Sequence, residues 1–317
     1  MIGCRAHKIG GTGDTPSGAA DASTSAHPSA AHRRALGQRA GSLGELIERR
    51  SRPRNAKLHR HAVWRPPLLR IIQSDLALSR NILLRSRKVA HGLTSALAFR
   101  ALRAGVGVAV EHSQVLGWLA PDTVVDAGAN RGQFSLMTRV KRPEATIIAF
   151  EPLSAPRAKL KAMFERDQHF RCEPYALGVE TARLEMKVTQ EDDSSSLRSV
   201  SDLQESLFGT REATTEFVEV RPLTAVLGLG DLKGRTLLKI DVQGFELELL
   251  RGAQPLLSAF DSVYVEASFV RLYTGQALVP ELVAFLAEQG FGMRGLFNQA
   301  WDDRFGPVQA DFLFQRS

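Results

Sequence analysis

The chain has 317 residues, 44% of them hydrophobic and 24% charged, a length that allows one α/β core of ordinary size with an appendage. Its two cysteines, Cys4 and Cys172, exclude a disulfide framework and a cysteine zinc site. No apolar run approaches the roughly 18 residues that a transmembrane helix needs. The N-terminus also lacks a secretion signal pattern, so we expect a cytoplasmic protein without a transmembrane segment.

The net charge of +7 is divided unevenly along the chain. Residues 1–100 hold 18 Lys and Arg against 5 Asp and Glu, whereas residues 101–317 hold 23 against 29. A basic segment of this kind can contact nucleic acid or an anionic membrane surface, or it can simply be solvated. Because its aromatic residues are few and no nucleic-acid-binding motif is present, we expect no nucleic-acid partner, and weak membrane-surface contact through this region stays open.

The N-terminal part of the chain divides into two segments. Residues 1–57 are rich in Gly, Ala, Ser, Thr, His and Arg and have no hydrophobic periodicity, which predicts a disordered basic low-complexity arm. The sequence does not decide whether this arm belongs to the native product, since the next methionine after Met1 is Met137. Residues 58–120 have a helical spacing of apolar residues, which predicts a helical N-terminal extension ahead of a domain that covers residues 121–317.

The segment TVVDAGANRGQFS at 123–135 has the pattern of a strand, a glycine turn and the start of a helix. The next apolar run, residues 146–150, would be the neighbouring parallel strand, and it ends at Glu151. A carboxylate at that strand tip is placed to accept two hydrogen bonds from the 2′,3′-diol of a ribose. The two segments together predict a nucleoside-binding site.

The glycine spacing distinguishes between cofactors. A dinucleotide fingerprint needs G-x-G-x-x-G, and Asn130 takes the place of its second glycine. Asp126 lies just upstream, where it would repel a pyrophosphate but suit a cationic ligand such as S-adenosylmethionine, near its methionine end. In a simpler interpretation the glycines only tighten the turn. We predict that S-adenosylmethionine is bound by Asp126, Gly128, Asn130, Gly132 and Glu151.

Strands and helices alternate along the rest of the chain. Apolar runs predict further strands at 170–177, 236–241, 262–267, 291–297 and 310–315. This alternation is typical of a mostly parallel sheet covered on both faces. The last two strands are joined by too few residues for a crossover helix, so we expect them to pair antiparallel. An insertion at 182–222, with extra strands at 182–188 and 217–220, is a lid over the substrate or a solvated loop.

Four carboxylates each end an apolar run, at Asp126, Glu151, Asp241 and Glu266. Ligands bind beyond the carboxyl ends of the strands in an open parallel sheet, which places these acids along one rim. Asp241 and Glu266 would be the catalytic candidates on the substrate side, where one of them accepts a proton from a hydroxyl group during methyl transfer. In the alternative, each is a helix N-cap or an ion-pair partner of Arg131, Lys239 or Arg271. The sequence assigns no metal ligands.

At this point the chain resembles a known family. The run LLKIDVQGFELELLRGA at 237–253 is similar to the LLKIDVEGAE-type signature of FkbM-like methyltransferases, and DAGANRGQFS followed by AFEP is similar to their cofactor-binding motifs. The resemblance extends over residues 121–316 and implies a Rossmann-like methyltransferase fold with a mostly parallel seven-stranded sheet and an antiparallel last strand. Two positions depart from the family pattern: Gln243 replaces the usual Glu, and Thr224 stands where Asp is common.

We therefore predict an S-adenosylmethionine-dependent methyltransferase. The resemblance implies that it O-methylates a hydroxyl group of a sugar or secondary metabolite, so that its partner is a small-molecule or glycan acceptor. Two alternatives stay open. One is a nicotinamide-dependent oxidoreductase. The other is a non-catalytic binding protein on a methyltransferase fold, which the departures at Gln243 and Thr224 suggest. The methyl acceptor, metal dependence and oligomeric state do not follow from the sequence.

Overall fold

The computed structural model describes residues 96–190 and 194–316. They belong to one compact unit of the chain, Pro66–Ser317, whereas a second unit, Met1–Arg65, lies outside the described residues. The predicted disordered arm at 1–57 and the part of the predicted extension before residue 96 lie outside them too. Within the described part, every helix is too short or too polar to span a bilayer.

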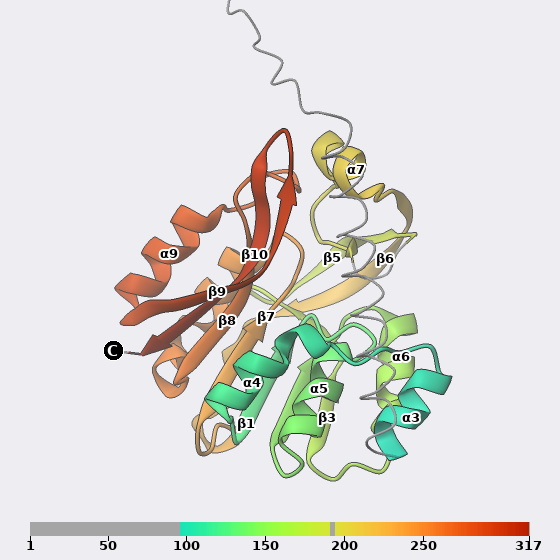
Figure 1. The fold of residues 1–317 in the computed structure, drawn as a ribbon, viewed down its shortest axis with the longest axis vertical. Helices are drawn as coiled ribbons and strands as arrows, with labels where there is room; N and C mark the ends of the chain where they lie inside the picture. Colours follow the sequence, from blue (N-terminus) through green and yellow to red (C-terminus); the bar gives the residue numbers. More distant parts are fainter. Residues whose placement is uncertain (1–95, 191–193, 317) are drawn as a thin grey trace, which may run out of the picture. The chain divides into compact units, whose positions relative to one another are not determined.

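A seven-stranded sheet in the order β3-β2-β1-β7-β8-β10-β9 forms the centre of the described unit (Figure 1). Neighbouring strands from β3 to β8 pair in parallel, while β10 pairs antiparallel with both β8 and β9. The predicted Rossmann-like, mostly parallel sheet with an antiparallel end is thus confirmed. The strands are β1 Thr123–Ala127, β2 Thr146–Phe150, β3 Phe170–Glu173, β7 Thr236–Ile240, β8 Ser262–Ser268, β9 Phe291–Asp302 and β10 Gly306–Arg316.

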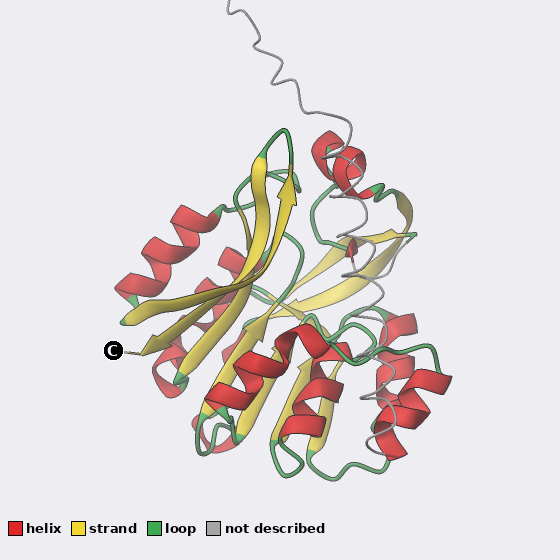
Figure 2. Ribbon diagram, in the orientation of Figure 1, coloured by secondary structure: helices red, strands yellow, loops and turns green. Residues whose placement is uncertain are grey.

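Helices cover both faces of this sheet (Figure 2). Successive side chains of a strand point to opposite faces, so Val124 and Val125 of β1 belong to different apolar clusters. One cluster contains residues of α8 and α9, and the other contains residues of α3, α4, α5 and α6. The helices are α3 Ala96–Arg103, α4 Ser113–Leu119, α5 Gln133–Lys141, α6 Ser154–Met163, α8 Glu246–Ala253 and α9 Val279–Glu288.

The residues just before β1 pack into the core of the sheet. Ala101 of α3, Val110 of the short 3-10 helix η1 (Val110–His112) and Leu116 of α4 are buried in the same cluster as Leu136 of α5. This packing places η1 at the carboxyl ends of the parallel strands. A hydrogen bond from the backbone N–H of Ala109 to the carbonyl oxygen of Gln133, at the start of α5, holds it there. The chain therefore brings His112 to the same edge as the motif after β1.

The predicted strand at 170–177 is split in two at Pro174. Its first half is β3 of the main sheet, and its second half is β4, Tyr175–Leu177, in a separate three-stranded sheet of order β4-β6-β5. A proline has no N–H to donate to a neighbouring strand, which interrupts the ladder at this position. The insertion supplies the other two strands, β5 Ala182–Thr189 and β6 Glu212–Arg221, and the helix α7 Asp202–Phe208 between them.

The last two strands are longer than predicted. The residues from 298 to 309, expected to be a connection, mostly continue β9 and β10 as a twisted antiparallel hairpin that projects beyond the sheet (Figure 1). Its outer strand, β9, keeps three large apolar side chains exposed: Met293, Leu296 and Trp301. The predicted antiparallel pairing of these strands is confirmed.

Candidate functional site

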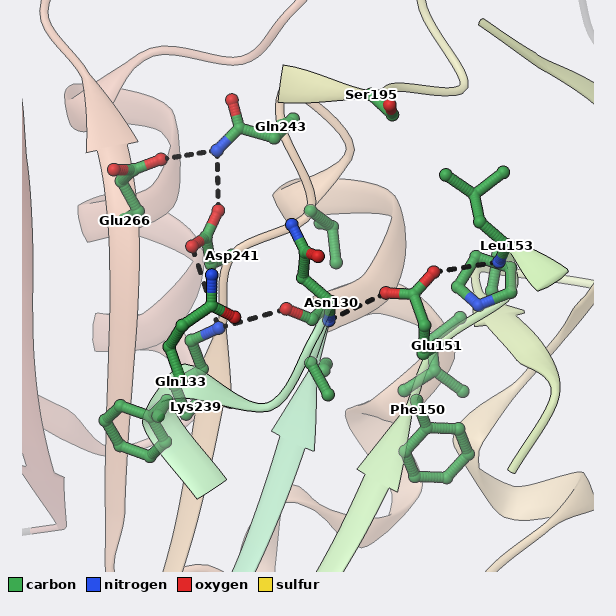
Figure 3. A pocket seen from close by; sticks show the side chains of 18 of the residues that line it. Asn130, Gln133, Phe150, Glu151, Leu153, Ser195, Lys239, Asp241, Gln243 and Glu266 are labelled. Carbon is green, nitrogen blue, oxygen red and sulfur yellow. Dashed lines mark hydrogen bonds and ion pairs between the residues drawn. The ribbon is translucent and has the colours of Figure 1, made fainter. Parts of the chain in front are cut away.

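A cavity of about 380 Å³ opens at the carboxyl ends of β1, β2, β7 and β8 (Figure 3). Its volume lies within the usual range for small-molecule sites, roughly 300–1,000 Å³. One side of the cavity is apolar and the other is polar and charged. The apolar side includes Phe150, Leu153, Tyr175, Leu177 and Leu197, and the polar side includes Asn130, Glu151, Lys239, Asp241, Gln243 and Glu266.

The turn after β1 is tied to the tip of β2 by three backbone amides. Gly128 and Ala129 both donate to the carbonyl oxygen of Phe150, at 3.1 and 3.0 Å, and Asn130 donates to Oε2 of Glu151 at 2.7 Å. Asn130 has a φ of +50°, a left-handed conformation that Asn tolerates better than most residues. These amides are already satisfied within the protein, so they offer no cradle to a phosphate group.

Glu151 lies at the tip of β2, as the sequence predicts, and faces the cavity (Figure 3). Its Oε1 accepts a hydrogen bond from the backbone N–H of Leu153 at 2.8 Å, and its side chain is almost buried, with the residue 4% exposed. Burial raises the pKa of Glu151 to about 7, although the two backbone N–H groups that it accepts oppose this rise. Each oxygen keeps a further lone pair for a donor in the cavity.

Asn130 also has an unused acceptor at the cavity. Its Oδ1 is buried and has no hydrogen-bond partner among the described residues. A buried acceptor without a partner is unfavourable by about 1–3 kcal/mol, which a donor from a bound ligand would relieve. Glu151 and Asn130 therefore present adjacent acceptors to a ligand with several hydroxyl or amino groups.

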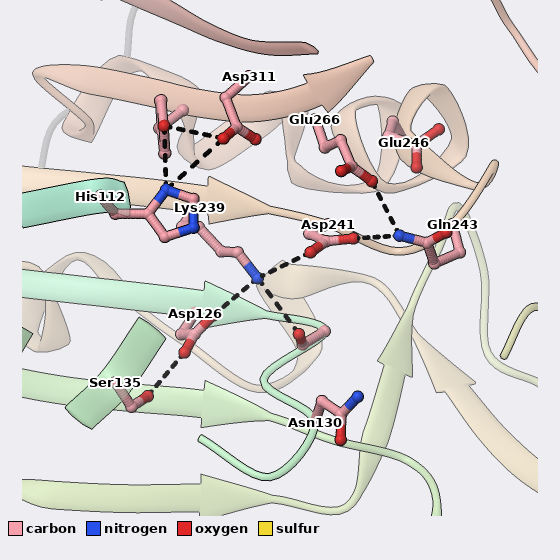
Figure 4. A network of polar contacts seen from close by, with 12 residues as sticks. His112, Asp126, Asn130, Ser135, Lys239, Asp241, Gln243, Glu246, Glu266 and Asp311 are labelled. Carbon is pink, nitrogen blue, oxygen red and sulfur yellow. Dashed lines mark hydrogen bonds and ion pairs between the residues drawn. The ribbon is translucent and has the colours of Figure 1, made fainter. Parts of the chain in front are cut away.

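Asp126 does not reach the cavity, in contrast to the prediction that it contacts the methionine end of the cofactor. The residue is fully buried, its Oδ2 accepts from Ser135 of α5 at 2.6 Å, and its Oδ1 lies 3.3 Å from Nζ of Lys239 (Figure 4). The side chain of Asp126 points from β1 toward α5, so it lies beneath the turn and does not face the cavity. Burial alone would lower the pKa of Lys239, but Asp126 and Asp241 raise it, and the ammonium stays charged.

The two glycines of the turn serve the packing of the fold. Gly128 has a φ of +75°, and a Cβ there would lie 1.8 Å from the backbone oxygen of Asp241. Gly132 has a φ of +90°, does not line the cavity, and a Cβ there would meet side chains of α6 at 2.4 and 2.8 Å. Gly132 is therefore required by the packing of the turn against α6, and its cofactor role stays a prediction. A larger residue at Gly128 would displace the end of β7, whether or not a ligand is bound.

Asp241 follows β7 and faces the cavity, with its side chain 36% exposed. Its Oδ1 accepts from Nε2 of Gln243 at 2.6 Å, and its Oδ2 lies 3.6 Å from Nζ of Lys239. The next helix, α8, has Phe245 as its N-cap, so Asp241 does not cap it. Of the two structural alternatives for Asp241, a helix N-cap and an ion pair, the structure contains the ion pair with Lys239.

Gln243 connects the two carboxylates of the substrate side. Its Nε2 donates to Oε2 of Glu266 at 2.8 Å as well as to Asp241, and its Oε1 accepts from the hydroxyl of Tyr273 at 2.7 Å (Figure 4). Burial raises the pKa of Glu266 well above its usual range, and the nearby charge of Asp241 raises it further. A glutamate at position 243 would add a third carboxylate here, whereas the amide bridges the other two. Thr224, the second departure from the family pattern, is exposed and lies outside the cavity lining.

His112 also lines the cavity, and sequence reasoning missed it. It contacts Tyr264 and Asp311, which are 152 and 199 positions away in the sequence and come from β8 and β10. Because the histidine lies in a short 3-10 helix without a motif of its own, only the tertiary packing reveals the cluster. No group of three or more His, Cys, Asp or Glu side chains in the described residues is arranged to hold a metal ion.

Sequence comparison agrees with this geometry. The family described as the Methyltransferase FkbM domain matches residues 126–293, which is more than half of the chain. The chain belongs to the FkbM methyltransferase family. The match includes the turn after β1, the tip of β2 and the segment from β7 to α8, and these FkbM elements provide most of the polar side of the cavity.

Two curated relatives of this FkbM chain match part of it. Methyltransferase 1 of Beauveria bassiana is 34% identical over 146 residues, which cover 41% of this chain and 57% of the relative. The AMB antimetabolite synthetase AmbE of Pseudomonas aeruginosa is 31% identical over 165 residues, 42% of this chain and 8% of the relative. The matched regions thus span just over half of the first relative and a small part of the second.

Solved structures of methyltransferases also align with the chain. Magnesium protoporphyrin IX methyltransferase from Synechocystis, solved with bound SAM, aligns at 14% identity and a TM-score of 0.37, covering 66% of this chain and 81% of that one. The N1-methyltransferase for 1,6-didemethyltoxoflavin from Burkholderia thailandensis, solved with S-adenosylhomocysteine, aligns at 11% identity and a TM-score of 0.33, covering 93% of both chains. Similarity at these levels does not bear on the acceptor.

Proposed function

We propose that this protein is an S-adenosylmethionine-dependent methyltransferase that methylates a hydroxyl oxygen of a small-molecule or glycan acceptor. Its family membership supports the reaction class. The main observation in support of this cofactor is the position of Glu151 at the tip of β2. Its two oxygens are held by backbone amides, and the residue lines the cavity. A ribose diol can donate to both oxygens at once. When bound there, S-adenosylmethionine supplies an electrophilic methyl group on a positively charged sulfur.

The remaining cavity lining fits the rest of this cofactor. The apolar side beyond the tip of β2 suits an adenine ring, and it includes Leu153, Tyr175 and Leu177. The buried Oδ1 of Asn130 can accept from a hydroxyl or amino group of the ligand. Asp241 offers a negative charge on the polar side, which favours a cationic ligand over a phosphate.

We assign Asp241 to holding the acceptor, through a hydrogen bond that it accepts from a hydroxyl next to the reacting one. Its carboxylate is accessible from the cavity, and the amide of Gln243 fixes its orientation. Glu266 contacts the same amide and also accepts from Nε2 of Gln309 at 3.1 Å. We therefore assign Glu266 to positioning Gln243, one step removed from the acceptor.

The oxidoreductase alternative is weaker because the turn after β1 cannot receive a pyrophosphate as a dinucleotide fold does. The first three amides of the turn donate to Phe150 and Glu151, and the fingerprint glycine is replaced by Asn130. Titration with fluorescent NADH separates the two cases. Saturable NADH binding in the micromolar range would favour the oxidoreductase.

Methyl transfer itself is tested with S-adenosylmethionine that carries a labelled methyl group. The acceptors are methyl glycosides of glucose, galactose, rhamnose and xylose, together with a set of phenolic and aliphatic secondary-metabolite alcohols. We expect label in at least one hydroxyl acceptor. A protein that binds the cofactor but labels none of these acceptors would instead agree with the non-catalytic binding alternative.

Replacing Glu151 with Ala is expected to weaken cofactor binding by roughly 2–4 kcal/mol, or about 30- to 1000-fold, because two charge-assisted hydrogen bonds to the ribose are lost. Isothermal titration calorimetry with S-adenosylhomocysteine measures the change. Glu246→Ala is a matched control, since Glu246 is equally buried but does not line the cavity. Unchanged affinity in a folded Glu151→Ala variant would remove Glu151 from the cofactor site.

Cofactor affinity is also expected to depend on pH. The pKa of Glu151 is raised to about 7 by burial, and the ribose hydroxyls donate to the ionised carboxylate. Binding therefore favours the deprotonated form, and affinity should fall as the pH decreases through 7, by up to about tenfold per unit below the pKa. Calorimetry with S-adenosylhomocysteine between pH 5.5 and 8.5 tests this prediction. These two pH values lie about 1.5 units below and above the pKa of Glu151.

The control for the pH dependence is a second carboxyl with a similar pKa. Burial raises the pKa of Glu246 to about 7 as well, and its Oε1 accepts from the backbone N–H of Gly244 outside the cavity. The slope should persist in Glu246→Gln and vanish in Glu151→Gln. A slope that survives in Glu151→Gln would assign the titration to another group.

A further inference from the structure

His112 is held at the cavity by a cluster of polar side chains from three strands (Figure 4). Its Nδ1 lies 3.1 Å from the hydroxyl of Tyr264 on β8, 3.6 Å from Oδ2 of Asp311 on β10 and 3.3 Å from Nδ2 of Asn298 on β9. The edges of Phe134 and Tyr264 pack against the imidazole, with ring centroids 5.2 and 5.6 Å away. The orientation of the ring is therefore fixed on both the polar and the apolar side.

The hydrogen bonds around Asp311 determine which nitrogen of His112 carries the proton. The Tyr264 hydroxyl donates to Oδ2 of Asp311 at 3.0 Å, and Asn298 donates to the same oxygen at 2.7 Å. The carboxylate is a stronger acceptor than a neutral imidazole, so the single hydroxyl proton of Tyr264 points to Asp311. The oxygen of Tyr264 is then an acceptor for Nδ1–H and for the second N–H of Asn298, whose Nδ2 lies 3.4 Å away, and Nε2 keeps its lone pair.

That lone pair is available at the cavity. Within residues 96–190 and 194–316, Nε2 of His112 makes no hydrogen bond or ion pair, and His112 lines the same cavity as Asp241. Asp241 itself is already engaged, because it accepts from Gln243 and faces the ammonium of Lys239. A carboxylate that is paired in this way is a weaker proton acceptor than an unengaged imidazole nitrogen.

Burial keeps the imidazole of His112 neutral near pH 7, against most of the charges that face it. Burial lowers the pKa of His112 below its usual value; Asp311 on β10, Glu111 on η1 and Asp241 after β7 oppose this shift, while Lys239 on β7 reinforces it. The imidazole is thus able to accept a proton at neutral pH. Once it has done so, the carboxylate of Asp311, close to Nδ1, stabilises the resulting imidazolium.

We propose that His112 is the general base that takes the proton from the acceptor hydroxyl, with Asp311 as the residue that positions it. This assignment rests on the proposed methyl transfer. As the acceptor oxygen forms its bond to the methyl carbon, the carbon–sulfur bond breaks and its electron pair stays on sulfur, which yields neutral S-adenosylhomocysteine. The hydroxyl proton moves to Nε2 of His112, and it leaves to solvent after the product departs. Asp241, which as a carboxylate can only accept hydrogen bonds, holds a neighbouring hydroxyl of the acceptor and keeps its ion pair with Lys239.

The first test is spectroscopic and needs no acceptor. Histidine-selective ¹⁵N labelling of the full chain reports the tautomer and the pKa of each imidazole, and His112→Gln identifies the signals of His112 by their loss. We expect Nδ1–H, an unprotonated Nε2 and a pKa below 6.5, the ordinary value for a histidine. A His112 that is protonated at pH 7, or that carries its proton on Nε2, would overturn the proposal.

The second test is kinetic and uses the hydroxyl acceptor with the highest turnover in the labelled-methyl panel. With saturating S-adenosylmethionine, so that the titration of Glu151 does not limit binding, His112→Gln should lower kcat by about 10²-fold or more and remove the acidic inflection from the pH profile of kcat. The affinity for S-adenosylhomocysteine should change less than about threefold. His169→Gln is the matched control, because that imidazole is exposed, pairs with Glu144 at 3.9 Å and does not line the cavity. The kcat of this variant should equal that of the wild type. A His112→Gln variant that keeps half of kcat, or keeps the inflection, would overturn the proposal.

Two further variants separate a base from a structural role. In Asp311→Asn the acidic inflection should move to lower pH, since the carboxylate that raises the pKa of His112 is gone. In His112→Ala, imidazole added to the buffer should restore part of the turnover, which would not happen if the histidine only supported the fold. Absence of both effects would exclude His112 as the base even though methyl transfer occurs. A wild-type protein without any methyl transfer would instead contradict the proposed function.

Discussion

Replacing Lys239 with Met is expected to lower the free energy of unfolding by about 3–5 kcal/mol, because it leaves a buried carboxylate without its counter-ion. Lys239 is 6% exposed, and its Nζ lies 3.3 Å from Asp126, which is fully buried. Met fills a similar volume, so the change removes mainly the charge and the hydrogen bond to the carbonyl oxygen of Gly128. Urea denaturation followed by circular dichroism measures the loss as a lower midpoint at an unchanged slope.

The double variant Asp126→Asn/Lys239→Met tests the cause of this loss. Removing both charges eliminates the unpaired carboxylate, and Asn can still accept from Ser135, so the double variant should recover most of the stability. Lys187→Met is a matched control at the surface, where the ammonium pairs with the exposed Glu185, and its urea midpoint should stay at the wild-type value. A Lys239→Met variant that is as stable as the Lys187→Met variant would contradict the importance of the buried pair.

Local sequence was sufficient for the strands that form the site. The predicted runs at 123–127 and 146–150 match β1 and β2, and the run at 236–241 matches β7 to within one residue. Each is a short, mostly apolar segment that ends at an acid or a glycine turn, so both its length and its end are encoded locally. The split at Pro174 and the extension of β9 and β10 depend on which strands they meet, and a single-strand pattern does not contain that information.

The same distinction applies to the site residues. Glu151 could be located from sequence because a strand tip is a local feature, and the structure has it facing the cavity. The direction in which Asp126 points could not be predicted, since it depends on a lysine from another strand that is 113 positions further on. The cluster of His112 with Tyr264 and Asp311 is likewise formed by strands far apart in the chain, and no spacing rule reports it.

Asp241→Asn is expected to lower turnover by on the order of 10²- to 10³-fold, because the acceptor molecule loses the charged group that keeps its reacting hydroxyl in line with the methyl group. The fold should persist, since the Asn carbonyl can accept from Gln243 and Lys239 retains Asp126 as its counter-ion. Affinity for S-adenosylhomocysteine should change less than about threefold in calorimetry, because the ribose is held at Glu151. Asp202→Asn, at an exposed position in α7, is the matched control and should retain full turnover.

The pH profile of the Asp241→Asn variant distinguishes the two polar groups at the acceptor. If Asp241 holds the acceptor through a neighbouring hydroxyl and His112 accepts the proton of the reacting one, the variant keeps an acidic inflection while its plateau falls. The inflection should shift to lower pH, because the charge of Asp241 raises the pKa of His112 in the wild type. Loss of the inflection together with the plateau would make Asp241 the base. Retention of more than about half of the wild-type turnover would remove Asp241 from the reaction, since a missing positioning group reduces rates by far more than twofold.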